Sequence, residues 1–212
     1  MQILKETDNV IICVKPSGVL STDETGGMPS LVKEAIGNPA AEICTVHRLD
    51  RVVSGLMVLA KSRSAASILG EQIMSRTFEK EYLAVIHGTP AEEEGAFRDL
   101  LFRDRSERKT YVAAAPGKGV KEAVLDYTVL AKADALSLVR ITLRTGRTHQ
   151  IRAQFSSRGM PLFGDRKYST CDDSCDIALW SYRLAFNEPM SGERLDVSLS
   201  PPDQYPWDLF RF

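Results

Sequence analysis

The sequence has few cysteines, histidines and tryptophans, and it has no long apolar run. Among 212 residues there are four cysteines, three histidines and two tryptophans. No apolar run approaches the roughly 20 residues that cross a bilayer. The first residues, MQILKETDNV, lack the basic and then apolar pattern of a signal peptide. We therefore expect a cytoplasmic protein with no membrane partner.

The cysteines and histidines also lack the spacing of a metal site. Cys171 and Cys175 form the pair CDDSC in a polar segment, but a zinc ion would need two further ligands. Cys13 and Cys44 lie in apolar runs, where we expect buried thiols. The chain has neither a Walker A loop nor a dinucleotide fingerprint. We therefore predict that no metal and no cofactor is used.

The residues that are present suit a packed globular protein, because 43% are hydrophobic and 26% are charged. The net charge of −1 is unevenly distributed along the chain. Residues 101–167 carry 14 Lys and Arg against 6 Asp and Glu, a net of +8. The remainder carries 13 against 22, a net of −9. This asymmetry indicates either one basic face for a nucleic acid or a set of solvated strand edges and loops.

Hydrophobic periodicity and turn residues predict a single α+β domain over residues 1–212, with a large, mostly antiparallel sheet. We expect one helix opened by Pro29 and closed by Gly37, one capped by Ser64, and a short one capped by Thr148. Regular structure should end near residues 200–202. Strands are expected at residues 9–14, 42–46, 54–60, 81–86, 109–113, 123–130, 136–143 and 177–186.

One loop, HRLDRVVSGL, places an acid among cations. Asp50 lies between Arg48 and Arg51 at the end of an expected strand. An ionised carboxylate there would suit nucleophilic attack or the stabilisation of a cationic sugar. A lone aspartate between arginines is more commonly a salt-bridged loop residue. Leu49 interrupts the His-Arg-Asp order of a kinase catalytic loop, which excludes that class.

A second cluster, RTGRTHQIR, surrounds the expected start of the short helix. Arg147 would lie beside the free amide groups of that helix, which favours an anion site. Ile151 and Phe155 are four residues apart and should face the core, whereas Arg152 could reach a phosphate. An ordinary basic helix start would explain the same residues. Tyr82 lies in the strand-like KEYLAV, where a tyrosine usually belongs to the core.

Taken together, five segments resemble the RluA family of RNA pseudouridine synthases. They occur in the order typical of that family and cover roughly residues 9–202. Any one of them alone would be a weak signal. The segments are KPSGVLS, HRLDRVVSGL, KEYLAVIHG, RTGRTHQIR and PLFGDRKY.

The resemblance implies a bent, mostly antiparallel sheet with flanking helices and a central catalytic cleft. It implies that uridine in rRNA or tRNA becomes pseudouridine without a cofactor, in a monomeric enzyme. Asp50 would be the catalytic acid, Tyr82 would stack on the target base, and Arg147 would pair with Asp50. Ile151 would line the pocket. We expect Arg48, Arg51, His149, Ile151 and Arg152 to bind substrate.

RNA contact outside the active site should come from the basic stretch. Its densest cations are Arg103, Arg105, Arg108 and Lys109. If these face away from the RNA, the path should run near Arg144, Arg152 and Arg158. The small N-terminal RNA-binding domain that many relatives carry is not expected, because the resemblance begins almost at residue 1.

Three positions depart from the family pattern, and two other classes of protein stay open. Val53 stands where Thr is usual, Gln154 where His is common, and Ser181 where Ala is common. These departures bear on loop geometry and substrate choice. The first alternative is a catalytically inactive RNA-binding module of the same fold. The second is a glycoside hydrolase, which would need a second catalytic carboxylate that no motif marks.

Overall fold

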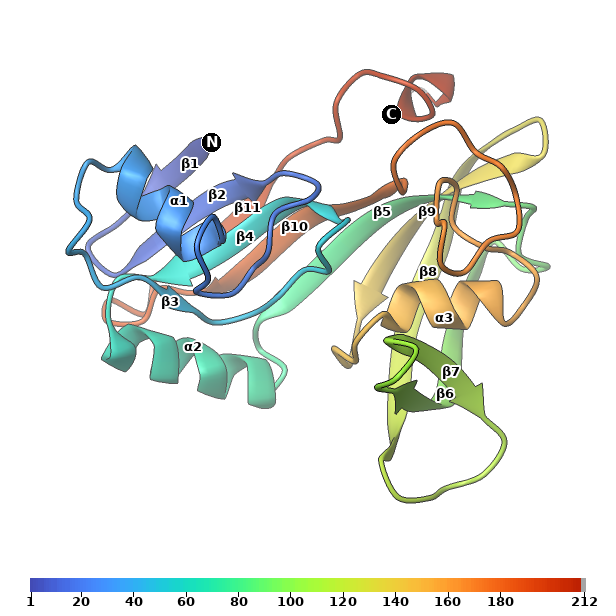
Figure 1. Ribbon diagram of the computed structural model, residues 1–212, viewed down its shortest axis with the longest axis horizontal. Coiled ribbons are helices and arrows are strands. Elements are labelled where there is room, and N and C mark those ends of the chain that lie inside the picture. Colours follow the sequence, from blue (N-terminus) through green and yellow to red (C-terminus); the bar gives the residue numbers. More distant parts are fainter. Residues whose placement is uncertain (211–212) are drawn as a thin grey trace. The chain divides into compact units, whose positions relative to one another are not determined.

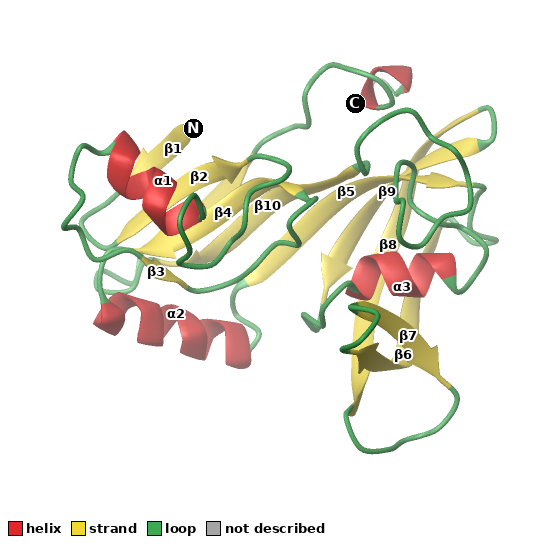
Figure 2. Ribbon diagram, in the orientation of Figure 1, coloured by secondary structure: helices red, strands yellow, loops and turns green. Residues whose placement is uncertain are grey.

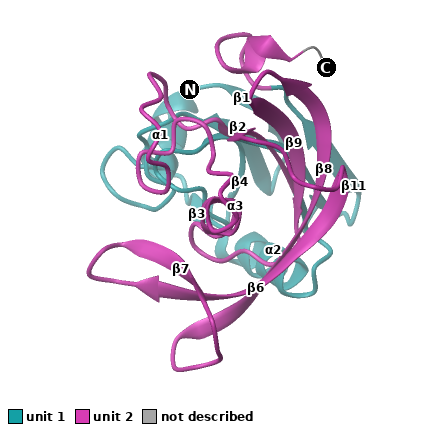
Figure 3. Cartoon of the chain, turned by 90° about the vertical axis from the view of Figure 1, so that its right-hand side faces the viewer, with its two compact units in different colours: residues 1–80, 180–200 teal, residues 81–179, 201–212 magenta. Residues whose placement is uncertain are grey.

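The computed structural model describes residues 1–210, and the chain forms two compact units (Figure 3). Unit 1 comprises Met1–Lys80 and Trp180–Ser200, and unit 2 comprises Glu81–Leu179 and the segment after Ser200. Strands and helices contribute to the fold (Figures 1 and 2), which confirms the α+β class. The chain passes between the units three times: inside strand β5, at the start of β10, and between Ser200 and Pro201 after β11. Within residues 1–210, no helix has the length and apolar character needed to cross a membrane.

The strands of unit 1 follow the order β1–β2–β4–β10–β11, and β3 also pairs with β4. β4 and β10 run parallel, and the other pairs described in this unit are antiparallel. Helix α1 follows β2, and helix α2 follows β4. The bounds are β1 Ile3–Glu6, β2 Val10–Lys15, α1 Met28–Ala35, β3 Cys44–Thr45, β4 Ser54–Ala60, α2 Arg63–Met74, β10 Leu179–Asn187 and β11 Arg194–Ser198.

Both faces of the central strands in unit 1 are covered, which explains their nearly continuous apolar sequence. On one face Val10, Val58 and Leu69 belong to a cluster that includes α2. On the other face Ile11 and Met57 pack with residues of α1. Each fully buried aliphatic side chain of this kind stabilises the fold by roughly 1.5–3 kcal/mol. The two clusters hold β2 and β4 as a rigid pair, and the loop that carries Asp50 leads directly into β4.

Unit 2 contains the antiparallel order β5–β9–β8–β6–β7 and, among the described residues, one short α-helix, α3. Phe155 of α3 packs edge-on against Phe97 with ring centroids 5.0 Å apart, and Tyr127 lies 4.7 Å from Phe97. Ile151 and Phe155 are both buried, which confirms that this face of the helix belongs to the core. The bounds are β5 Glu79–His87, β6 Glu94–Asp104, β7 Lys109–Ala113, β8 Val120–Ala133, β9 Leu136–Leu143 and α3 Gln150–Ser156.

Two expected helix caps were wrong. The side chain of Ser62, not Ser64, accepts the N–H of Ala65 and begins α2. The N-cap residue of α3 is His149, not Thr148, and it has a left-handed backbone conformation (φ 54°). Its side chain makes no capping hydrogen bond to the helix. In both cases the expected residue was of a type that often caps helices, but it lies one or two residues from the true cap. The local backbone conformation decides which residue caps, and the sequence pattern does not encode it.

Several strands were missed or misjudged. β1, β6 and β11 were not expected, and the predicted strand at 42–46 shrinks to Cys44–Thr45. In β6 the buried side chains Phe97 and Leu101 are four residues apart, so the alternation of a strand is hidden. Regular structure also continues past residue 202, because a 3₁₀ helix spans Trp207–Leu209.

Candidate active site

Lys15, the last residue of β2, holds the loop that carries Asp50. Its side chain is fully buried, and Nζ donates to the carbonyl oxygens of Pro16 (2.9 Å), Arg51 (3.0 Å) and Val53 (2.7 Å). Three acceptors match the three donors of a charged ammonium group. Burial lowers the pKa of Lys15 to about 8, and the nearby Asp50 carboxylate opposes that shift. The lysine therefore fixes the loop backbone and places a cation close to Asp50.

Residues 17–21 clamp the same loop from the other side. The buried Ser21 hydroxyl donates to the carbonyl of Leu49 (2.8 Å) and accepts the N–H of Leu49 (3.0 Å). The N–H of Gly18 donates to the Arg51 carbonyl, and Arg51 Nε donates to the Gly18 carbonyl at 2.8 Å. The backbone on both sides of Asp50 is thus held by hydrogen bonds from the segment KPSGVLS.

Asp50 lies at a tight turn in this clamped loop. Its carbonyl accepts the N–H of Val53 at 3.0 Å, which closes the turn. Asp50 is half-buried, whereas Arg48 and Arg51 are exposed. Leu49 and Val53 are buried on either side of the turn. The backbone that carries the carboxylate is therefore held in one conformation, and chemistry on a bound substrate benefits from groups positioned in advance.

His47 at the start of the motif has a structural position. Its ring is buried 5.6 Å from Phe78, and Nε2 accepts the N–H of Val58 at 3.0 Å. That bond places the ring proton on Nδ1. Burial, with a smaller contribution from Lys80, lowers the pKa of His47 to about 3. The ring is therefore neutral at physiological pH and secures the loop to β4.

Gly55 brings the end of this loop against β10. It has φ +115°, and a Cβ there would lie 2.5 Å from the backbone nitrogen and oxygen of Ser181. Only glycine permits this approach without displacing a strand. The Ser181 hydroxyl is buried and has no hydrogen-bond partner among residues 1–210. The departure at this position thus leaves a small polar group beside the loop.

In unit 2, Tyr82 occupies the interior of β5. Its ring is buried, and it lies opposite Ile141 of β9. The strand fixes the direction of the side chain, since neighbouring residues on a strand point to opposite faces. The expected position in a core strand is confirmed, and the proposed stacking role stays a prediction.

The loop with Arg147 is organised by Gln150, the first residue of α3. Its Oε1 accepts the N–H of Arg147 (2.9 Å) and the hydroxyl of Thr145 (2.8 Å), while Nε2 donates to the carbonyl of Val124 (3.1 Å). Arg147 is exposed, and its Nε donates to the carbonyl of Glu122 at 2.9 Å. The side chain of Arg147 is therefore hydrogen-bonded to the backbone near the start of β8. Its pairing with Asp50, which lies in unit 1, stays a prediction.

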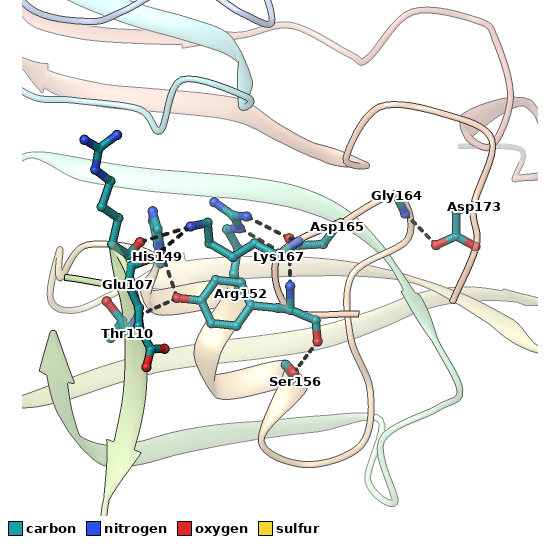
Figure 4. A network of polar contacts seen from close by, with 11 residues as sticks. Glu107, Thr110, His149, Arg152, Ser156, Gly164, Asp165, Lys167 and Asp173 are labelled. Carbon is teal, nitrogen blue, oxygen red and sulfur yellow. Dashed lines mark hydrogen bonds and ion pairs between the residues drawn. The ribbon is translucent and has the colours of Figure 1, made fainter. Parts of the chain in front are cut away.

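Arg152 forms a buried ion pair inside unit 2 (Figure 4). Its Nε and one terminal nitrogen each lie 2.7 Å from an oxygen of Asp165. Both side chains are buried, with relative exposures of 6% and 0%. Asp165 also accepts the backbone N–H groups of Lys167 and Tyr168. The guanidinium thus anchors the segment PLFGDRKY to α3, and its predicted contact with substrate is untested.

His149 is held by the same segment. Its Nδ1 lies 2.8 Å from the hydroxyl of Tyr168, and that hydroxyl accepts the N–H of Thr110 at 2.7 Å. The Thr110 hydroxyl in turn donates to the carbonyl of Thr148. These bonds connect β7, α3 and the PLFGDRKY loop. They fix the ring of His149 at the cap position, and its predicted contact with substrate stays a prediction.

Comparison with known proteins matches this arrangement to one family. A family model described as RNA pseudouridylate synthase matches residues 9–157. The chain belongs to this family. The predicted resemblance to RluA-type synthases is confirmed, and the enzyme class is that of an isomerase acting on RNA.

Curated relatives and solved structures agree with the family. The chain is 33% identical over 219 residues to ribosomal large subunit pseudouridine synthase D of Nitrosomonas europaea, covering 96% of this chain and 62% of that protein. It is 29% identical over 214 residues to the RNA pseudouridine synthase YlyB of Bacillus subtilis, covering 96% and 70%. The human RNA pseudouridylate synthase domain containing 1 shares the fold, with a TM-score of 0.81 at 22% identity over 97% of this chain and 84% of that one.

Sequence reasoning missed three residues that position this synthase's candidate groups. Lys15, Gln150 and Tyr168 lie in segments that carried the resemblance, but none was given a role. A lysine that ends the apolar run VIICVK was the available signal, because a buried lysine needs several acceptors. No comparable signal marked Gln150 or Tyr168, whose partners are distant in the sequence.

Proposed function

We propose that this synthase converts specific uridines of RNA to pseudouridine with Asp50 as its catalytic carboxylate. The observation that carries the proposal is the clamped turn, in which Lys15 and Ser21 fix the backbone on both sides of Asp50. The reaction places strict demands on geometry, since a misplacement of about 1 Å can cost roughly a hundredfold in rate.

The chemistry rearranges one nucleoside without an added reactant. The C1′–N1 bond breaks, the uracil turns, and a C1′–C5 bond forms; C5 loses a proton and N1 gains one. Asp50 either attacks C1′ or acts on the base while the glycosidic bond opens. Both routes need an ionised carboxylate at a fixed position. No metal or cofactor is required by either route.

Tyr82 and Arg147 serve the same reaction in this proposal. A base in a stack must first be flipped out, at a cost of a few kcal/mol. Stacking on the Tyr82 ring would offset part of that cost, and Arg147 would pair with Asp50. Arg48, Arg51 and His149 would hold the neighbouring RNA. Ile151 is buried in the core of unit 2 and would form the apolar wall behind the base.

The substrate is proposed to be rRNA or tRNA in the cytoplasm. Relatives named for the large ribosomal subunit favour rRNA as the first substrate to test. The competing proposal is an inactive RNA-binding module of the same fold. The hydrogen bonds that hold the turn at Asp50 argue against the inactive module, because a protein that only binds RNA would not need the backbone of this turn to be fixed.

The test is a transcriptome-wide map of pseudouridine in a strain that lacks the gene. We expect at least one position in rRNA or tRNA to lose pseudouridine, and we expect the wild-type gene to restore it. A gene carrying Asp50→Asn should not restore it. If no position changes in the deletion strain, the inactive module becomes the better explanation.

A further inference from the structure

The β6–β7 hairpin of unit 2 carries aromatic side chains on a face that the described chain leaves open. Phe102 of β6 pairs directly with Tyr111 of β7 on one side and with Val120 of β8 on the other. Directly opposed residues of antiparallel strands point to the same face. Phe102 and Tyr111 are each 39% exposed. The result is a row of apolar side chains across three strands.

The opposite face of the same strands is covered, so the exposure of the row has a clear cause. Leu101 and Ala123 pack with Ala153 of α3, and Tyr168 lies against this cluster. Figure 1 shows α3 beside β6 and β7, with the loop from β7 to β8 extending beyond it. Phe102 and Tyr111 alternate with the covered residues, and they therefore face away from α3. A Cβ at Gly119 would be in van der Waals contact with the Phe102 ring, at 3.9 Å, so glycine at this position leaves that edge of the ring open.

Cations without ion-pair partners lie in the turn and the loop that adjoin this row. Among residues 1–210, Arg105 and Arg108 in the turn and Lys118 in the next loop form no ion pair, and all are exposed. Lys109 Nζ lies over the Tyr111 ring, 5.5 Å from its centroid. The acids of the turn are occupied locally: Asp104 accepts N–H groups of the turn itself.

Tyr111 is also held in place. Its hydroxyl donates to Glu107, which fixes one edge of the ring. A fixed ring loses little conformational entropy when a second flat group stacks on it. Positive charge that is not balanced by the protein attracts a polyanion, and exposed aromatic rings bind bases through stacking.

We infer that the row Tyr111–Phe102 is a stacking surface for unpaired bases of the RNA, with Arg105, Arg108 and Lys118 binding the adjacent phosphates. The inference rests on the proposed function only in that the bound polymer is RNA. Unpaired nucleotides are the occupant, because the bases of a duplex are already stacked on each other and offer no free face. The hairpin thus binds a single-stranded segment of the substrate RNA.

The test compares two oligonucleotides that differ only in their bases. One is a chain of twelve uridines, and the other is an abasic chain of the same length and charge. The variants are Phe102→Ala with Tyr111→Ala, and a second double variant with leucine at both positions to preserve apolar packing. Leu130→Ala, at another exposed apolar residue of β8, is the matched control. Circular dichroism and thermal unfolding confirm that each variant is folded.

Wild type should bind the uridine chain more tightly than the abasic chain. Both double variants should lose about fivefold or more in affinity for the uridine chain, keep their affinity for the abasic chain, and keep the salt dependence. Tyr111→Phe should keep most of the affinity for the uridine chain, because it keeps the ring and loses only the smaller contribution of the contact that fixes the ring to Glu107.

Two outcomes would overturn the inference. Unchanged affinity for the uridine chain in both double variants would leave the row without a role in RNA binding, as expected if it seats a protein. Equal losses for both oligonucleotides would show an effect on phosphate binding and not on stacking. These experiments measure binding and not catalysis. The stacking surface can therefore be disproved while Asp50 proves catalytic, and it can be confirmed even if Asp50 proves not to be catalytic.

Discussion

The loop around Asp50 and the β6–β7 hairpin are opposite in how they use polar groups. In the loop, Lys15 and Ser21 satisfy the backbone groups, and little of the local geometry is left free. On the hairpin, Arg105 and Arg108 are exposed and have no ion pair among residues 1–210. Chemistry requires groups that are fixed before substrate arrives, whereas binding of a polyanion requires charge that the protein has not neutralised.

A second contrast within unit 2 supports this division. Arg144, Arg152 and Arg158 form ion pairs with Asp126, Asp165 and Asp99 at 2.6–2.9 Å. The sequence predicts that RNA would bind along these arginines if the cations of the hairpin faced away from it. Their internal partners favour the hairpin instead, since a phosphate would first have to displace a carboxylate.

Lys15→Met should produce the largest effect among the residues that support the loop. It removes three hydrogen bonds and the cation beside Asp50, so the single-turnover rate should fall about a hundredfold or more. Lys5→Met, at an exposed lysine of β1, is the matched control. A folded Lys15→Met enzyme with a rate within twofold of wild type would show that the clamp is irrelevant to the reaction.

Arg147→Ala should lower the single-turnover rate by about ten- to a hundredfold with saturating enzyme, since charge-assisted contacts of this kind are worth roughly 1.5–3 kcal/mol. Arg147→Lys should be intermediate, because it keeps the charge and loses the bond to the Glu122 carbonyl. Arg166→Ala is the control: it removes another exposed arginine of unit 2 and should leave the single-turnover rate unchanged. An unchanged rate in Arg147→Ala would place Arg147 outside the reaction.

Neutralising Arg105, Arg108 and Lys109 together should weaken RNA binding and leave the chemical step nearly unchanged once RNA is saturating. Each lost phosphate contact should reduce the slope of log affinity against log salt by about 0.7 for single-stranded RNA. The control replaces Lys5, Lys33 and Arg76 of unit 1. A triple variant with wild-type affinity and salt slope would mean that the hairpin faces away from the RNA.

A change of pH should produce the smallest of these effects. As pH rises through about 8, Lys15 loses a proton and one donor, so the rate should decline several-fold. The pKa of Lys15 is below its ordinary value, so between about 8 and 10.5 the unfolded chain binds more protons and this group's contribution to stability rises with pH. The decline should therefore occur without unfolding, and Lys15→Met should lack it. A wild-type rate that stays flat from pH 7 to 9.5 would contradict the assignment.

Much of the fold could be predicted, because in most strands the pattern of apolar residues in the sequence matches the pattern of buried side chains. β4, β7 and β9 were predicted with their observed bounds. The missed strands lack that coincidence. β1 is only half-buried, and β6 has its buried residues at a helix-like interval.

The candidate residues could be named from motifs, but their environment could not. Arg152 and Asp165 are 13 residues apart, and Lys15 reaches carbonyls 36 and 38 residues away. Such partners depend on how strands pack, which composition and spacing do not encode. The exposure of Phe102 and Tyr111 likewise depends on α3 packing against the opposite face of the hairpin, a contact that residue spacing does not encode.

The most direct test of the central claim is the single-turnover rate of Asp50→Asn on a substrate RNA, measured together with its affinity for that RNA. The substitution keeps the shape of the side chain and removes its charge. We expect near-complete loss of pseudouridine formation with RNA binding largely retained. Turnover within about tenfold of wild type, a difference of only about 1.4 kcal/mol in activation free energy, would contradict the assignment of Asp50 as the catalytic carboxylate.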